Sequence, residues 1–197
     1  VVSIFLYVLI EQGIGTWLPT FNNEVLGLPN NVSVQITSIF AAALALGRLL
    51  AGQVLKHIHW YPFLNVCIVG MGLIIVLLLP LTEVTSTANV AQISDAPAVA
   101  YLLPLIGLMM APIYPVLNSV MLSSLERSKH AAMTGLIVVF SALGGTTGSI
   151  ITGFTFEAFG GQNAFYLSLI PMVLILACLY RFNDVSAKSS ALQSAQT

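Results

Sequence analysis

Glu11 stands in the middle of the apolar run YVLIEQGIGTWLPTF, where a carboxylic acid requires a physical explanation. An ionisable group at membrane depth is costly and usually faces a cavity or a partner. A carboxyl in such a place can accept hydrogen bonds from a ligand and can exchange a proton. Small and polar residues recur every four positions along the first apolar span, 1–21, and so share one helix face: Ser3, Tyr7, Glu11 and Gly15.

This face and the adjacent Gln12 are predicted to line a polar cavity. The alternative is that Glu11 bonds a neighbouring helix, since polar groups also hold membrane helices together.

A second set of polar residues lies in the stretch 98–122, which contains YLLPLIGLMMAPIYPVLNSVML. Tyr114 and Asn118 share a helix face at four-residue spacing and bring hydrogen-bonding groups into an apolar span. Such groups suit a polyhydroxy ligand, which needs both donors and acceptors. Asn118 has an alternative role, because its amide can bond a backbone carbonyl freed by Pro115.

Residues that weaken helices accompany both sets. Gly13 and Gly15 follow Glu11. Pro112 and Pro115 flank Tyr114. Glycine lowers helix stability, and proline also removes a helix hydrogen bond. These four residues are expected to supply bending points, and the stretch 98–122 is expected to form a kinked helix.

Three more residues are candidates for the cavity or its ends. Trp17 can close the outer end of the cavity, or it can anchor the helix at the lipid interface. Gln35 is a polar candidate near the outer end of the second span. Arg48 stands toward the inner end of that span, near the rim, where it can extend to the interface or pair with a helix C-terminus or an acid.

The composition indicates an all-α integral membrane protein. Of the 197 residues, 57% are hydrophobic and only 7% are charged, too few charges to cover a soluble domain of this size. A spanning helix needs about 20 mostly apolar residues. Six stretches satisfy this requirement: 1–21, 33–56, 62–82, 98–122, 132–155 and 163–182. The remainder, 183–197, is expected to be a polar tail.

The charges alternate from loop to loop. Every lysine and arginine falls on one side of the predicted spans: Arg48, Lys56, Arg127, Lys129, Arg181 and Lys188. The other side has four acids and no basic residue: Glu24, Glu83, Asp95 and Glu157. Because positive loops stay in the cytoplasm, we expect the basic side and the C-terminus to be cytoplasmic.

Several function classes lack the residues they need. All three histidines fall in loops, no GxSG motif occurs, and no catalytic constellation suggests an enzyme. The net charge of −1 gives no reason to expect a nucleic-acid partner. No metal or cofactor is expected, because Cys67 and Cys178 both lie in apolar runs. Gly144 and Gly148 form a GxxxG pattern that predicts close helix packing.

The chain resembles the C-terminal half, helices seven to twelve, of a major facilitator superfamily transporter, within the fucose permease-like branch of sugar:proton symporters. The resemblance rests on YVLIEQGIGTWLPTF, on GRLLAG and on GLMMAPIYPVLNSVML. It implies a six-helix bundle that is half of a twelve-helix fold, with a preceding six-helix half as partner. It also places Gly47, Arg48 and Gly52 at the start of a cytoplasmic loop motif, although Lys56 stands where that motif has an acid.

The resemblance implies secondary transport of a small polar solute across a bacterial inner membrane by alternating access. A monosaccharide is the favoured solute, with protons as a candidate coupling ion. Glu11, Gln12, Trp17, Gln35, Tyr114 and Asn118 are the candidate binding residues. Two alternatives remain open: an exporter of drugs, amino acids or carboxylates with the same fold, and a structural or sensory membrane protein. A carboxylate is disfavoured here, because the only candidate cation, Arg48, is expected near the rim.

Overall fold

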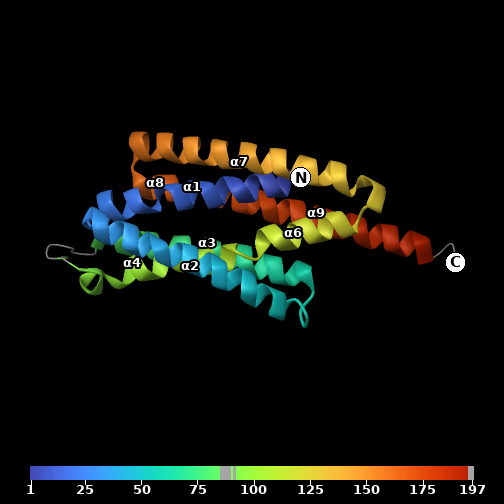
Figure 1. The fold of residues 1–197 in the computed structure, drawn as a ribbon, viewed down its shortest axis with the longest axis horizontal. Coiled ribbons are helices and arrows are strands. Elements are labelled where there is room, and N and C mark those ends of the chain that lie inside the picture. Colours follow the sequence, from blue (N-terminus) through green and yellow to red (C-terminus); the bar gives the residue numbers. More distant parts are fainter. Residues whose placement is uncertain (85–89, 91, 195–197) are drawn as a thin grey trace.

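Six membrane-spanning segments run lengthwise through the computed structural model, which describes residues 1–84, 90 and 92–194 (Figure 1). The first three spans are single helices: α1 (Val2–Glu24), α2 (Asn30–Val54) and α3 (Trp60–Val84). The fourth consists of α4 (Ala98–Leu102), η2 (Leu103–Leu105), α5 (Ile106–Met110) and α6 (Ile113–Ser123). The fifth is α7 (His130–Phe159), and the sixth comprises α8 (Gly161–Tyr166) and α9 (Leu169–Ser194).

The predicted fold class is confirmed. The six spans are long and apolar enough to cross a membrane, and no strand occurs in the described part of the chain. The helices begin and end close to the ranges expected from the sequence. The largest difference is at the C-terminus, where α9 continues to Ser194 and so takes in most of the segment 183–197.

The fourth span is broken, as the prolines predict. Pro104 lies in η2, and Pro112 lies between α5 and α6. Each proline lacks a backbone N–H and its ring collides with the preceding turn, so the regular hydrogen-bond ladder cannot pass through it. The regular α-helix is therefore interrupted twice in this span, once on each side of α5, and Tyr114 lies just after the second interruption.

Glycines bring α1 and α7 into direct backbone contact. A Cβ atom at Gly144 would collide with the carbonyl of Phe5, and one at Gly148 would collide with the carbonyl of Leu9. On α1, a Cβ at Gly13 would lie 2.5 Å from the Thr152 hydroxyl oxygen. The expectation of close packing at the GxxxG pattern is thus confirmed.

A second helix pair, α2 and α5, is packed in the same way. A Cβ at Gly47 would lie 2.6 Å from the Leu108 carbonyl oxygen and 2.6 Å from the Ala111 Cβ. From the other side, a Cβ at Gly107 would lie 2.9 Å from the Phe40 carbonyl oxygen. The bundle therefore contains two closely packed pairs, α1 with α7 and α2 with α5.

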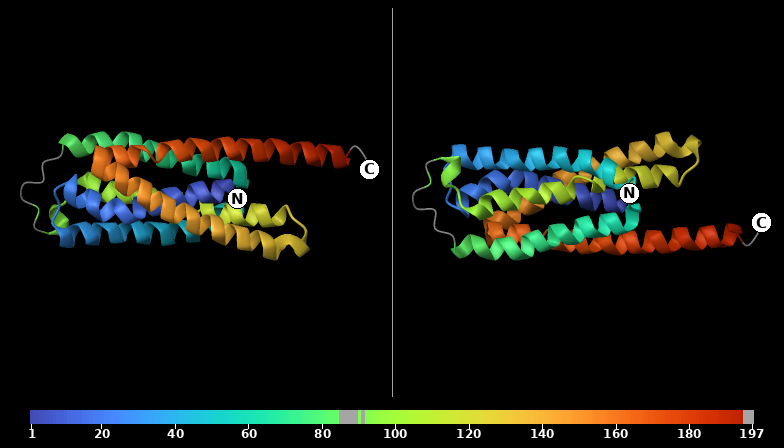
Figure 2. Two further views of the ribbon diagram at one scale, coloured as in Figure 1. Left: turned by 90° about the horizontal axis from the view of Figure 1, so that it is seen from above. Right: turned by 90° about the horizontal axis from the view of Figure 1, so that it is seen from below.

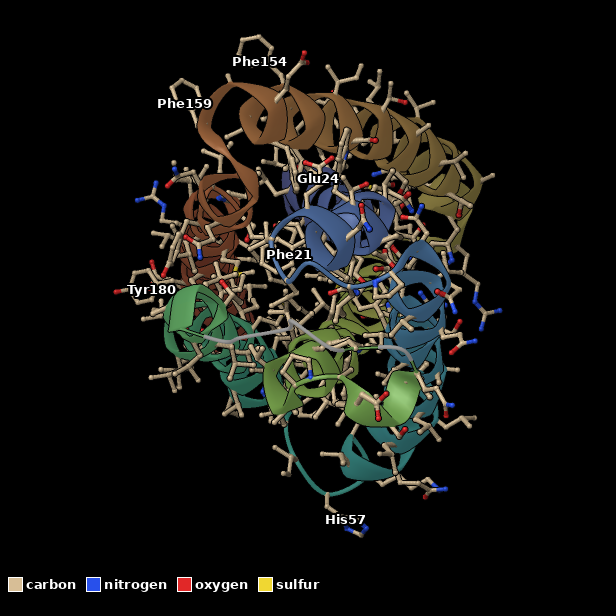
Figure 3. All side chains as sticks on the ribbon, turned by 90° about the vertical axis from the view of Figure 1, so that its left-hand side faces the viewer. Phe21, Glu24, His57, Phe154, Phe159 and Tyr180 are labelled. Atoms are coloured by element: carbon tan, nitrogen blue, oxygen red, sulfur yellow. The ribbon has the colours of Figure 1, made fainter. Side chains whose placement is uncertain are left out.

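Large apolar side chains separate into a core and an outer surface. Phe21 is fully buried and stacks on Phe165 with ring centroids 4.5 Å apart. Seen along the bundle, Phe154, Phe159 and Tyr180 project away from it, and all three are exposed (Figure 3). In a membrane protein such an outer surface faces lipid, so exposed aromatic residues are expected there.

The loops at the two ends of the bundle differ in charge, as the sequence predicted. The α2–α3 and α6–α7 connections, which carry Lys56 and Lys129, lie at the end nearest the C-terminus (Figures 1 and 2). The α1–α2 and α7–α8 connections, next to Glu24 and Glu157, lie at the opposite end. The side chains of Glu83 and Lys188 are outside the described residues.

We expect Gly148→Ala to destabilise the protein by about 1–3 kcal/mol, because the added methyl group overpacks the α1–α7 contact. The measurement is the midpoint of thermal unfolding in detergent. Gly135→Ala on the same helix is the matched control, since a Cβ there meets no heavy atom within 4 Å. The control should be neutral or slightly stabilising. Equal shifts for the two variants would contradict the packing argument.

Candidate functional site

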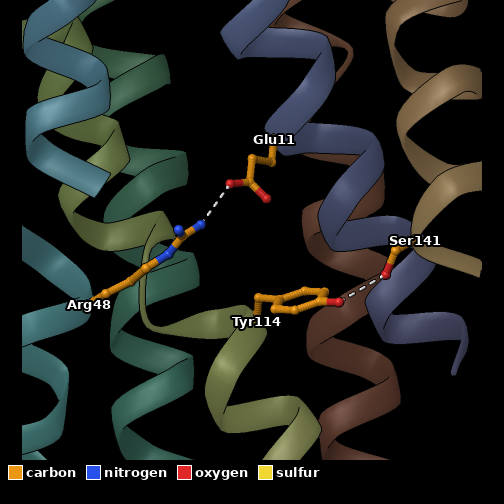
Figure 4. A network of polar contacts seen from close by, with 4 residues as sticks. All are labelled: Glu11, Arg48, Tyr114 and Ser141. Atoms are coloured by element: carbon orange, nitrogen blue, oxygen red, sulfur yellow. Dashed lines mark hydrogen bonds and ion pairs between the residues drawn. The ribbon is translucent and has the colours of Figure 1, made fainter. Parts of the chain in front are cut away.

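An ion pair joins α1 to α2 in the middle of the bundle. The Arg48 Nη2 atom donates to the Glu11 Oε1 atom at 3.2 Å (Figure 4). The Glu11 side chain is only 16% exposed, whereas the Arg48 side chain is 53% exposed. Glu11 is therefore held inside the protein, and Arg48 reaches it from a more open position.

A second polar contact joins α6 to α7 nearby. The Tyr114 and Ser141 hydroxyl oxygens lie 3.3 Å apart (Figure 4). The Tyr114 ring also approaches the ring of Tyr7 on α1, with centroids 6.0 Å apart. The buried Tyr7 hydroxyl makes no hydrogen bond of normal geometry within the described residues. Glu11, Arg48, Tyr114 and Ser141 are called the polar cluster below.

Two predicted residues, Gln12 and Asn118, lie close in the sequence to members of the polar cluster. Gln12 is exposed and packs over Gly145 of α7, where an added Cβ would lie 3.1 Å from the Gln12 Cγ. Asn118 is one turn beyond Tyr114 on α6, and its Oδ1 atom is buried without a hydrogen-bond partner among the described residues. An unsatisfied buried acceptor of this kind costs about 1–3 kcal/mol.

Trp17 and Gln35 are not brought to the polar cluster. The Trp17 Nε1 atom donates to the Ser149 carbonyl oxygen at 2.9 Å, and the indole stacks on Phe156, so this side chain is packed against α7. Gln35 is exposed on α2, and its distance from Arg48 along the helix is about 20 Å at 1.5 Å per residue. Their roles in binding stay predictions.

The expected bending points differ in their surroundings. Helix α1 is continuous through Gly13 and Gly15, and both glycines make close contacts, Gly13 with Thr152 and Gly15 with Phe40. Pro112 separates α5 from α6, and the exposed Pro115 stands in the first turns of α6. The helix is thus interrupted at Pro112, whereas Gly13 and Gly15 lie where α1 contacts neighbouring helices.

The residues assigned to the loop motif all lie inside α2, which ends at Val54. Gly47 is buried against α5, and Gly52 is exposed with no heavy atom within 4 Å of an added Cβ. Arg48 pairs with Glu11, so of its three possible roles the structure favours the ion pair with an acid. The contact brings Arg48, expected near the rim of the cavity, together with Glu11.

A crevice opens beside Arg48 between α2 and α6. It has a volume of about 440 Å³, and Arg48, Gly52, Trp60, Ser119 and Ser123 are among the residues that line it. No group of three or more histidine, cysteine or acidic side chains that could hold a metal occurs in the part of the chain that the structure describes. The polar side chains that line the crevice are Arg48, Trp60, Ser119 and Ser123.

The family comparison agrees with this architecture of broken, membrane-spanning helices. The sequence model of the Major Facilitator Superfamily matches residues 85–196, which is more than half of the chain. The chain belongs to the major facilitator superfamily. The matched region contains α4 to α9, and hence Tyr114 and Ser141, while Glu11 and Arg48 precede it. Neither the curated proteins nor the solved structures gave a match.

Membership identifies the chain in general terms as a secondary transporter of the membrane, since the members of this family are transporters. Ser141 and the partnership of Arg48 with Glu11 were not predicted as parts of the site. The signal for the ion pair was present, because one acid and one base each interrupt an apolar span.

The ion pair should contribute a small but measurable free energy of coupling. When both partners of an ion pair are buried, removal of one partner destabilises the protein by about 3–5 kcal/mol. Because the Arg48 side chain is half-exposed, a coupling of about 0.2–1 kcal/mol is expected instead. The measurement is a double-mutant cycle of Glu11→Gln and Arg48→Gln on the free energy of unfolding.

The control cycle combines Arg48→Gln with Glu24→Gln, since Glu24 is exposed at the far end of α1. Those two changes should be additive. Additivity in the Glu11 cycle as well would mean that the ion pair does not form.

Proposed function

We propose that this chain forms one half of a twelve-helix secondary transporter that moves a small, hydroxyl-rich solute by alternating access. A monosaccharide is the first candidate, as the resemblance to the fucose permease-like branch implies. The observation that carries the proposal is the polar cluster, to which four helices contribute in a chain of this superfamily.

The chemistry of the polar cluster and its neighbours suits a polyol. Each sugar hydroxyl can donate and accept one hydrogen bond, so its binding site needs both functions within a short distance. Glu11 supplies acceptor oxygens, and Arg48 supplies donors. The Gln12 amide can both donate and accept hydrogen bonds. The buried Oδ1 atom of Asn118 is an acceptor without a partner among the described residues. Hydrogen bonds to charged groups are stronger than those between neutral groups, which favours binding to the ion pair.

The architecture supplies a means of movement. A rocking transporter must change the angle of some helices while others stay rigid. The break at Pro112 lies just before Tyr114, so a change of angle there would alter the contact between Tyr114 and Ser141. Glu11 is the acid of the polar cluster, and we propose it as the group that would carry a proton if transport is proton-coupled.

The distribution of charge supports an orientation. We propose that the end with Lys56 and Lys129 faces the cytoplasm, together with the C-terminus, and that the membrane is a bacterial inner membrane. Further proposed partners are the lipid bilayer and a preceding six-helix half.

Glu11→Gln should lower the rate of solute uptake at least about tenfold, because the amide keeps the shape of the side chain but loses the charge that binds Arg48. Uptake is measured in proteoliposomes that contain the protein expressed from its complete coding sequence. The panel consists of labelled monosaccharides and their acids, at several values of pH.

Glu24→Gln is the matched control, since it removes an acid from the same helix outside the polar cluster. Its uptake should equal that of the unmodified protein. Uptake by Glu11→Gln that retains both its rate and its pH dependence would show that Glu11 has no role in transport.

A further inference from the structure

The guanidinium of Arg48 has donors that Glu11 does not use. A guanidinium carries five N–H groups in a planar fork. Glu11 engages it through one terminal nitrogen, Nη2, in a single contact of 3.2 Å (Figure 4). The Arg48 side chain is 53% exposed and forms part of the wall of the 440 Å³ crevice between α2 and α6. Part of the fork is therefore available to a molecule in that crevice.

The crevice itself is positively charged. Arg48 is the one ionisable residue in its wall, and the other polar side chains there are Ser119, Ser123 and Trp60, all of which are neutral. Glu11 is not part of this wall, and its side chain is 16% exposed. A molecule in the crevice thus meets a cation directly, while the compensating acid lies behind it. This arrangement attracts an anion more than it attracts a neutral polyol.

The shape of the cation narrows the choice of anion. The planar fork of arginine matches the two oxygens of a carboxylate, which it can bind through two parallel hydrogen bonds. Glu11 already accepts one hydrogen bond from this fork from within the protein. A carboxylate of the solute would therefore share Arg48 with Glu11 or replace it.

We propose that the solute is a polyhydroxy carboxylate, and that Arg48 binds its carboxylate group in the crevice between α2 and α6. The inference rests on the proposed function and specifies the substrate class of the same site. The hydroxyl groups of the solute are left for Ser119 and Ser123, which line the same crevice. Arg48 pairs with Glu11, which is held inside the protein, so the position of Arg48 no longer argues against a carboxylate as the substrate.

The test compares acids with their neutral counterparts. Gluconate with sorbitol, and glucuronate with glucose, are pairs in which a carboxylate replaces a hydroxymethyl group. Each compound is titrated into the full-length protein in neutral detergent, and binding is followed by the rise in the unfolding temperature. At least one acid should bind with an affinity about tenfold or more above that of its neutral counterpart.

Variants identify the residue responsible. Arg48→Gln should weaken binding of the acid about ten- to a hundredfold, and Arg48→Lys less, because lysine keeps the charge but not the fork. Glu11→Gln should tighten binding of the acid, since it frees the Arg48 guanidinium from its ion pair. A neutral sugar bound through Glu11 would show the opposite response. Arg127→Gln, an exposed charge in the α6–α7 connection, is the matched control and should have no effect.

Two additions to the experiment cover a variant that does not fold and a lipid that binds Arg48. If Arg48→Gln does not fold, the double variant Glu11→Gln/Arg48→Gln removes both charges together and should fold without binding the acid. A lipid phosphate could also occupy Arg48, so the titrations are repeated in nanodiscs of phosphatidylcholine with and without phosphatidylglycerol. Stabilisation by phosphatidylglycerol that depends on Arg48 and that no acid can displace would overturn the proposal.

Failure of the inference can be separated from failure of the proposed function. Uptake of a neutral monosaccharide that depends on Glu11, without binding of any acid, would overturn the substrate class alone. Binding of an acid that is unchanged in Arg48→Gln would overturn it as well. The absence of binding and uptake for every compound of the panel would overturn both.

Discussion

The backbone contact between α1 and α7 sets the orientation of α1, and the polar cluster depends on that orientation. Gly144 and Gly148 permit the approach, because any side chain at these positions would collide with the α1 carbonyls. Gly13 faces Thr152 of α7, and Glu11 is two residues away, a rotation of about 200° around the helix. Fixing one side of α1 against α7 therefore directs Glu11 away from α7 and toward Arg48 on α2.

Much of the fold could be predicted from the sequence because the bilayer imposes strict rules. A membrane span must be long, apolar and helical, so the six spans are visible in hydrophobicity alone. The interruptions of the fourth span at Pro104 and Pro112 have an equally local cause, although Pro115 lies inside the continuous helix α6. The end of α9 could not be predicted in the same way, because a helix can continue into water once the apolar span has ended.

The candidate site was harder to predict, because its contacts join helices that are distant in the sequence. Glu11 and Arg48 are 37 residues apart, and their meeting depends on how far α1 and α2 are shifted along each other. Spacing along one helix contains no information on that shift. Gly13 and Gly15 illustrate the same limit, since a glycine can permit either bending or close packing, and only the neighbouring helix decides which. The indole of Trp17 likewise packs against α7, a direction that its position in α1 does not determine.

Contacts within the two closely packed helix pairs and polar contacts between those pairs differ in whether a ligand can replace them. Within the pairs α1–α7 and α2–α5, glycines place backbone against side chain or backbone, and no ligand can substitute for such packing. Across the boundary between the pairs, Gly15 meets Phe40 in an apolar contact, but the ion pair of Glu11 with Arg48 is polar. The contact of Tyr114 on α6, which continues the span of α5, with Ser141 on α7 is polar as well, and a solute with hydroxyl or carboxylate groups can form bonds equivalent to these two. A solute that binds at the polar cluster therefore competes with the bonds that join the pairs, while each pair stays intact. Movement within this part of the transporter is consequently expected along the boundary between the pairs, where binding energy can offset the loss of the protein's own contacts.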